Sequence, residues 1–301
     1  MTRTALVTGA AGFIGSALIR ALASAGYRVH GLDRAAPDDA LRARVSHWSV
    51  GDLSQDLPPD LPAADEVYHC AGSGMVGPSF SDPAADFRAN VATTANLVAW
   101  VAKQRGARLV LVSSAAVYGI QPVMPIGEMA PLNPTSPYGV HKRLAERQVR
   151  DYARNFDFNA AVVRLFSVYG PGLRKQLLWD ACTKLTQGAP SFGGSGSEER
   201  DWIQVDDAVA LLIQAVAAAT PACPTFNGGT GVSTTVRQAL ELLARKLGQA
   251  APLRFSGETR RGDPRALVAS VAAAHAIGWV PQISLADGIS QYAEWFRSAG
   301  R

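Results

Sequence analysis

The 301-residue chain contains little cysteine, and its three residues of this type are Cys70, Cys182 and Cys223. Three thiols cannot form a complete set of disulfides. None of them stands in a CxxC motif or at a Cys/His spacing that binds metals. The sequence therefore predicts a protein of the reducing cytoplasm that holds no metal.

Long apolar runs and runs of one charge are missing as well. The longest apolar stretch, residues 208–219, follows two aspartates and is too short to cross a bilayer, so we expect a buried helix and no membrane. The first predicted strand begins within four residues of the N-terminus, so we expect no signal peptide. The net charge of +4 comes without a lysine/arginine run, so we expect no nucleic-acid partner.

The chain does contain a regular alternation of strand-like and helix-like segments. Strands are predicted at residues 3–8, 27–32, 45–50, 66–70, 108–113 and 160–166. Helices are predicted at residues 13–25, 83–104 and 137–156, and proline-rich loops at 54–64 and 119–136. This order is typical of an α/β protein with a Rossmann-type, doubly wound parallel sheet.

The alternation weakens after about residue 170, where glycines begin to cluster. We expect a dinucleotide-binding domain over residues 1–170, to which residues 203–229 return by covering and extending the sheet. The segments 171–202 and 230–301 are then expected to form a smaller, interleaved α/β substrate lobe.

Residues 8–15 read Thr-Gly-Ala-Ala-Gly-Phe-Ile-Gly and follow the apolar run 5–7. Gly9 permits a tight turn, Gly12 lets backbone amides approach a pyrophosphate, and Gly15 lets the following helix pack closely on the strand. The positive end of that helix is a natural place for an anion. The motif predicts a dinucleotide site, although by itself it is also compatible with a simple strand–helix turn.

Asp33, at the end of the second predicted strand, strengthens this interpretation. A carboxylate at this place accepts hydrogen bonds from the adenosine ribose hydroxyls. It would also repel a 2′-phosphate, which favours NAD over NADP. The neighbouring Arg34 leaves NADP open, because its guanidinium could meet a 2′-phosphate if Asp33 turned away.

A second motif, Tyr-Gly-Val-His-Lys, occupies residues 138–142. Ser136 is a good N-cap and Pro137 suits the first helical position, so a helix is expected to begin here. Tyr138 and Lys142 are then one turn apart on the same face. An ammonium at that distance, together with a positive nicotinamide ring, would lower the pKa of the phenol from about 10 toward working pH.

Ser114 follows the predicted strand 108–113, at the edge where open α/β sheets bind ligands. Its hydroxyl is expected to bond the same substrate oxygen as Tyr138. We therefore predict a catalytic set of Ser114, Tyr138 and Lys142. The alternative, an ordinary surface pair of tyrosine and lysine on a helix, is disfavoured by the glycine turn.

Taken together, these motifs resemble the extended short-chain dehydrogenase/reductase family. The resemblance rests on the Gly-x-x-Gly-x-x-Gly turn, on Ser-Ser-Ala-Ala-Val-Tyr-Gly at 113–119 and on Ser-Pro-Tyr-Gly-x-x-Lys at 136–142. Within this family the chain is most similar to nucleotide-sugar epimerases of the UDP-galactose 4-epimerase type. Further matches lie at residues 51–53, 69–72, 164–172, 200–207 and 260–264.

The resemblance implies a wider cofactor site. Asp52 is expected to accept from the adenine amino group, Leu53 to cover the ring, and the backbone of Phe166 to border the nicotinamide carboxamide. Besides the three glycines, Asp33, Tyr138 and Lys142, the predicted cofactor residues are Phe13, Ile14, Arg34, Asp52, Leu53, Cys70, Ala71, Gly72, Asn90, Ser113 and Phe166.

The same resemblance implies how a nucleotide-diphosphate sugar would be held. Arg200 and Arg260 are expected to grip the diphosphate, since the fork of a guanidinium matches paired phosphate oxygens. Gln176 is expected to reach the phosphate or sugar, and Trp202 to line the base pocket. Ser167 departs from the asparagine usual in the epimerases, so the substrate or its pose can differ. A surface ion pair at Arg200 and core packing of Trp202 are the alternatives.

The predicted activity is NAD-dependent epimerisation of a nucleotide-diphosphate sugar, at C4 of a UDP-hexose, through a transient 4-keto intermediate. The alternative is an NAD(P)H-dependent nucleotide-sugar 4-ketoreductase of deoxysugar biosynthesis. A 4,6-dehydratase is disfavoured, because similar dehydratases carry an Asp-Glu pair where this chain has Ala115 and Ala116. A non-catalytic nucleotide sensor is disfavoured by the intact serine, tyrosine and lysine. Polysaccharide biosynthesis is expected from the resemblance alone.

The resemblance also implies a homodimer in which the helices at 83–104 and 137–156 form a four-helix bundle with their copies. Apolar residues at helical spacing support it, namely Val91, Ala95, Val98 and Val101.

Overall fold

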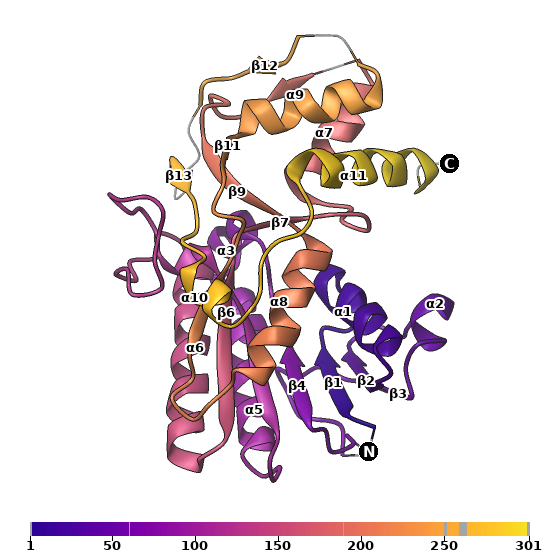
Figure 1. Ribbon diagram of the computed structural model, residues 1–301, viewed down its shortest axis with the longest axis vertical. Helices are drawn as coiled ribbons and strands as arrows, with labels where there is room; N and C mark the ends of the chain where they lie inside the picture. The colour runs from indigo at the N-terminus through magenta and orange to yellow at the C-terminus, as the bar shows by residue number, and fades with distance from the viewer. Residues whose placement is uncertain (1, 60, 189, 250–251, 259–263, 300–301) are drawn as a thin grey trace.

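The computed structural model describes residues 2–59, 61–188, 190–249, 252–258 and 264–299. Its larger part is a seven-stranded sheet with the strand order β10-β6-β5-β4-β1-β2-β3, and every neighbouring pair is parallel. The predicted Rossmann-type sheet is therefore confirmed (Figure 1). Its strands are β1 (Thr4–Thr8), β2 (Arg28–Asp33), β3 (His47–Val50), β4 (Glu66–His69), β5 (Arg108–Ser114), β6 (Asn159–Leu165) and β10 (Thr225–Gly228).

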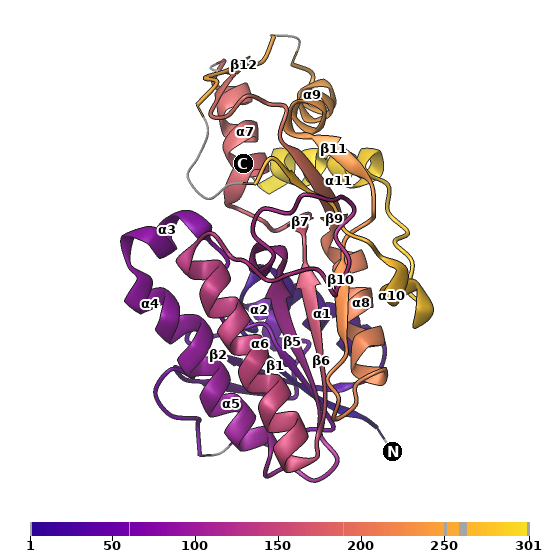
Figure 2. The same ribbon diagram turned by 90° about the vertical axis from the view of Figure 1, so that its left-hand side faces the viewer.

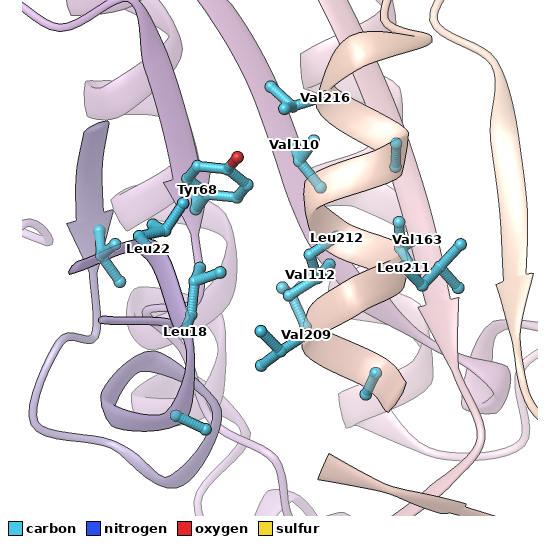
Figure 3. Packing of buried hydrophobic residues seen from close by; sticks show 14 of the residues in the cluster. Leu18, Leu22, Tyr68, Val110, Val112, Val163, Val209, Leu211, Leu212 and Val216 are labelled. Carbon is cyan, nitrogen blue, oxygen red and sulfur yellow. The ribbon is translucent and has the colours of Figure 1, made fainter. Parts of the chain in front are cut away.

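Helices cover both faces of this sheet (Figure 2). On one face α1 (Phe13–Ser24) packs beside α8 (Val205–Ala217) over Tyr68 and Val110, as Figure 3 shows. On the other face lie α5 (Thr93–Val101) and α6 (Pro137–Phe156). Because side chains alternate along a strand, each strand contributes apolar groups to both cores.

The helix predicted over 137–156 is confirmed at both ends. The Ser136 hydroxyl accepts the Gly139 N–H at 3.2 Å, and Pro137 occupies the first turn. The helix ends where Asp157 takes a left-handed conformation with φ of 52°. The helix predicted over 83–104 is interrupted, and consists of α4 (Pro83–Phe87), a π-helical segment at Arg88–Ala92, and α5, which ends at Val101.

A smaller part lies above the carboxyl ends of the strands (Figure 1). Its sheet is built on β9 (Glu199–Gln204), which pairs with β7 (Ser167–Tyr169), β11 (Ser233–Thr235) and β13 (Ala266–Leu267). A third apolar core joins this sheet to α7 (Gln176–Thr186), α9 (Val236–Leu247) and α11 (Leu285–Ala299). The sequence analysis predicted none of these helices. The remaining elements are α2 (Asp39–Arg42), α3 (Val76–Ser81), a 3-10 turn at Ala115–Val117, α10 (Ala272–Ala276), and the pair β8 (Ser191–Phe192) and β12 (Arg254–Phe255).

The chain leaves the large sheet after β6 and returns to it with α8 and β10, which adds the last parallel strand beside β6. The apolar stretch at 208–219 is largely the buried face of α8, as predicted. No helix in the described ranges is long and apolar enough to span a membrane.

Candidate active site

A cavity of about 490 Å³ opens at the carboxyl ends of the parallel strands, between the large sheet and the smaller part. It is lined from the sheet side by residues that follow β1, β4, β5 and β6, and from the other side by residues of α7 and β9. Of the predicted site residues, those that line it are Gly9, Gly12, Phe13, Ile14, Gly15, Cys70, Gly72, Ser113, Ser114, Tyr138, Lys142, Phe166, Ser167, Gln176, Arg200 and Trp202.

The glycine turn after β1 has no room for side chains. Gly9 has φ of +65°, and a Cβ there would lie 2.6 Å from the Ala71 nitrogen. A Cβ on Gly15 would lie 2.1 Å from the Gly9 carbonyl oxygen. No side chain caps the first turn of α1, which begins at this place. The turn is thus an open backbone cradle at a positive helix end, and it fits a pyrophosphate.

Asp33 is held against this turn. One carboxylate oxygen accepts the Ala11 N–H and the other the Ala35 N–H, each at 3.0 Å. These contacts keep the negative charge where the ribose of a dinucleotide would bind. Arg34 is exposed beside it. The carboxylate is therefore not turned away to make room for a 2′-phosphate.

Other predicted cofactor residues lie around the cavity rather than on its wall. Asp52 accepts the Ser54 N–H at 2.9 Å, and this hydrogen bond lowers the pKa of the carboxyl. Leu53 is 4% exposed and packs in the core under α5, so its cover of an adenine ring remains a prediction.

Asn90 sits in the π-helical segment. Its Nδ2 donates to the Asp86 carbonyl, and its Oδ1 is buried without a partner in the described structure. A Cβ on Gly72 would lie 2.7 Å from this oxygen and 3.3 Å from the Lys142 ammonium. A buried acceptor without a donor is unfavourable, and a ligand hydroxyl approaching Gly72 would satisfy it. This orphaned atom fits the presence of a dinucleotide.

The predicted catalytic residues come together at the centre of the cavity. Ser114 ends β5, and its hydroxyl hydrogen-bonds the phenol of Tyr138 on α6. Lys142, one turn further along α6, donates to the Val112 carbonyl at 3.1 Å. Its Nζ lies 6.0 Å from the centroid of the Tyr138 ring. The Ser79 hydroxyl accepts the Tyr138 backbone N–H at 3.1 Å and so ties α3 to the start of this helix.

Burial dominates the electrostatics of this set. It raises the pKa of Tyr138 to about 12, against the opposing effect of the Ser114 hydrogen bond. It lowers the pKa of Lys142 to about 8, although Asp86 opposes this. In the protein without a cofactor the phenol is therefore protonated at neutral pH, because desolvation raises its pKa. The prediction that Lys142 and a nicotinamide ring together lower this pKa concerns the cofactor-bound protein and stays a prediction. The positive charge that favours a phenolate must come with a ligand.

The far wall carries the predicted substrate residues. Arg200 donates to the carbonyls of Glu199 and Pro264, and Trp202 is 8% exposed with its ring edge-on to Tyr169. Gln176 begins α7 in a left-handed conformation with φ of 67°. Arg260 lies outside the described residues.

Two charged residues that line the cavity were missed by the sequence analysis. Lys175 precedes α7 and lines the cavity near Arg200 and Gln176. Glu198 lines it as well, where its carboxylate accepts the N–H groups of Ser195 and Gly196. For Glu198 the Gly-Ser-Gly-Ser sequence at 194–197 was an available signal, since such turns are often closed by a nearby carboxylate.

A Rossmann-type sheet, a glycine turn, and a serine, tyrosine and lysine set in one cavity define the class of dinucleotide-dependent short-chain dehydrogenases and reductases. The model of the NAD dependent epimerase/dehydratase family matches residues 5–227. The chain belongs to this family, as the sequence motifs indicated.

Several relatives resemble the chain over nearly its whole length. The UDP-glucose 4-epimerase of Mycolicibacterium smegmatis is 32% identical, over 97% of this chain and 98% of its own. The solved structure of MoeE5 with UDP-glucuronic acid and NAD is 30% identical, with a TM-score of 0.90 over 98% of this chain and 99% of its own. The Thermotoga maritima UDP-glucose 4-epimerase with UDP-glucose is 27% identical, with a TM-score of 0.90 over 99% and 100%.

Proposed function

We propose that this protein interconverts the C4 epimers of a UDP-hexose with bound NAD, through a transient 4-keto sugar. The observation that carries the proposal is the shared cavity, which Ser114, Tyr138 and Lys142 line together with the glycine turn. The UDP-glucose 4-epimerases among its relatives support the substrate class.

The chain's own residues divide the work at C4. Tyr138 takes the proton of the C4 hydroxyl and later returns it, while the Ser114 hydroxyl holds the same oxygen. Bound NAD would supply the hydride acceptor and donor at C4, and its positive ring would favour the phenolate. Lys142 is fixed by the Val112 carbonyl, with donors left for the nicotinamide ribose. The methyl groups of Ala115 and Ala116 offer no acid or base for dehydration.

We assign the far wall to the nucleotide sugar. Arg200 would pair with the diphosphate, aided by Gln176 and by the cation of Lys175, and Trp202 would pack against the base. Ser167, in place of a longer asparagine, would leave additional room near the sugar. Arg260 is proposed as a second diphosphate ligand from its sequence motif alone.

The decisive assay offers UDP-glucose or UDP-galactose to the purified protein, with and without added NAD or NADPH, and follows the products by NMR. We expect the C4 epimer to form without any added reductant. Stoichiometric loss of NAD(P)H with a 4-keto sugar, and no epimer in its absence, would instead establish the 4-ketoreductase.

We further propose a two-fold dimer through α4, α5 and α6. Three of the four residues first invoked for it, Val91, Val98 and Val101, are buried within the protomer, and the fourth, Ala95, is half-buried. Support comes instead from large apolar side chains that are exposed on this side, namely Phe87, Val140 and Leu144. Light scattering should give twice the chain mass, and Leu144→Glu should give the monomer. A monomeric wild type would refute the dimer.

We also propose residues 1–170 with 203–229 as the NAD-binding domain, and 171–202 with 230–301 as the substrate lobe. The return of α8 and β10 to the large sheet supports this division.

A cytoplasmic location is supported by the unpaired Cys70, Cys182 and Cys223, and a role in polysaccharide biosynthesis by the resemblance alone. Cell fractionation and the glycan profile of a deletion strain test these two points.

A further inference from the structure

A buried carboxylate lies directly behind the catalytic residues. Lys142 is at position i+4 from Tyr138 on α6, and Glu146 is at position i+4 from Lys142, so the three side chains share one face of the helix. It has no exposed surface. Its position was not predicted as part of any site, and neither the proposed chemistry nor the cofactor cradle uses it.

Glu146 joins three elements of the fold. Its Oε1 accepts the Ser113 hydroxyl at 2.6 Å from β5 and the Arg164 Nε at 2.9 Å from β6. Its Oε2 accepts Arg164 at 2.7 Å and Arg150 of α6 at 3.1 Å. Arg164 is 2% exposed, so an ion pair with two hydrogen bonds is enclosed between α6 and the sheet.

These contacts affect catalysis because they join the segments that carry Ser114 and Tyr138. Ser113 immediately precedes Ser114, and Glu146 is two turns from Tyr138 on a rigid helix. The Ser113–Glu146 hydrogen bond therefore ties the strand that carries the serine to the helix that carries the phenol. Arg164 clamps the same helix face onto β6 through two hydrogen bonds to the carboxylate.

We propose that Glu146 is a positioning residue for the reaction, which through Ser113 and Arg164 fixes Ser114 and Tyr138 at the separation that lets both hydroxyls meet one substrate oxygen. A displacement of about 1 Å between reacting groups can lower a rate about 100-fold. The kinetic test of this inference rests on the proposed function. The hydrogen-exchange test described below rests only on the geometry of α6 and β5.

The charge of Glu146 adds a second, measurable effect. It acts with Asp86 and Cys70 to raise the pKa of Lys142 against the larger, opposing effect of burial. Arg164 and Arg150 face the carboxylate and hold its own pKa low, so it is ionised at neutral pH. Removing this charge should lower the pKa of Lys142 and move the alkaline limb of kcat/KM to lower pH.

A buried ion pair is weak evidence for stability, since well-packed apolar residues often replace one without loss. The test must therefore separate positioning from folding. Val149→Ala is the matched control, because Val149 is fully buried on the same helix and packs in the core, and its apolar side chain forms no hydrogen bond with the catalytic residues. It should lower the melting temperature and leave kcat per folded molecule unchanged.

Glu146→Gln keeps the shape and part of the hydrogen bonding but removes the charge. We expect it to lower kcat for UDP-galactose about tenfold or more, to change KM by less than about threefold, and to shift the alkaline limb. If it instead behaves as Val149→Ala does, with full kcat in the folded protein and an unmoved pH profile, the proposal is wrong.

Two further measurements separate positioning from folding, and the second of them does not depend on the proposed activity. Ser113→Ala removes the hydrogen bond to Glu146, so it should lower kcat about fivefold at saturating NAD, and unchanged kcat would oppose the proposal. The exchange rates of backbone amide hydrogens test the positioning of α6 and β5 without any substrate. Glu146→Gln should speed exchange of the first α6 turns and the end of β5, whereas Val149→Ala should affect the middle of the helix. If amide exchange changes in the same way in the two variants, Glu146 is an ordinary core residue and the proposal is wrong. This outcome does not depend on whether the protein is an epimerase.

Discussion

Acid should destabilise this protein through one histidine at the edge of the cofactor cradle. His69 ends β4 and is 1% exposed. Its Nδ1 lies 2.7 Å from the Thr8 hydroxyl and its Nε2 3.1 Å from the Thr94 hydroxyl. Thr94 donates its own proton to the Asn90 carbonyl, so the hydrogen-bond network assigns a neutral ring that donates from Nε2 and accepts at Nδ1. Protonation at Nδ1 would force the Thr8 hydroxyl to accept instead of donate, and would place a charge in a buried site.

The magnitude follows from the pKa. Burial lowers the pKa of His69 from 6.5 to about 3, with a smaller contribution from Lys142. Because the folded state disfavours the proton, its stability is complete above the unfolded pKa of 6.5 and is lost as pH falls toward the folded one. At about 1.36 kcal/mol for each pH unit below 6.5, His69 alone removes about 2 kcal/mol from the free energy of unfolding between pH 7 and pH 5.

Urea unfolding at pH 7 and pH 5 measures this loss. His69→Gln retains an acceptor and a donor but cannot titrate, so its stability should fall by about 2 kcal/mol less than that of the wild type over the same interval. The contribution of other groups, including His30 with its lowered pKa, is common to both proteins. The exposed His275→Gln is the control and should follow the wild type. Equal losses in His69→Gln and the wild type would refute the assignment of a buried neutral ring.

Three further perturbations address the site. Tyr138→Phe removes only the proton acceptor, so turnover should fall at least about 100-fold while NAD binding in calorimetry stays nearly unchanged, and more than about a tenth of the wild-type rate would contradict its role. Gly15→Ala places a Cβ 2.1 Å from the Gly9 oxygen and should abolish NAD binding, whereas Gly77→Ala meets nothing within 4 Å and should bind as the wild type does. Asp33→Ser should weaken NAD and improve NADP relative to it, and a wild type that already prefers NADP would overturn our assignment of Asp33.

Local signals explain what the sequence predicted well. The helix at 137–156 was bounded by a serine cap and a proline at its first position, and both act within one turn of the chain. The glycine turn and the catalytic spacing were equally local, because Tyr138 and Lys142 needed only a helix between them. A smaller lobe was predicted but its strands were not, because the short strands β7, β11 and β13 become strands only when β9 pairs with them.

The sequence by itself determined the parallel sheet, the glycine turn and the spacing of the proposed catalytic residues, since apolar period, glycine spacing and helix caps depend on neighbouring residues. Only the tertiary structure decided the charge state of Tyr138, the burial of Val91 and Val98 within the protomer, and the enclosure of Glu146 by Arg164. Each of these depends on which distant segment removes water from a side chain, and desolvation is a property of packing rather than of order along the chain.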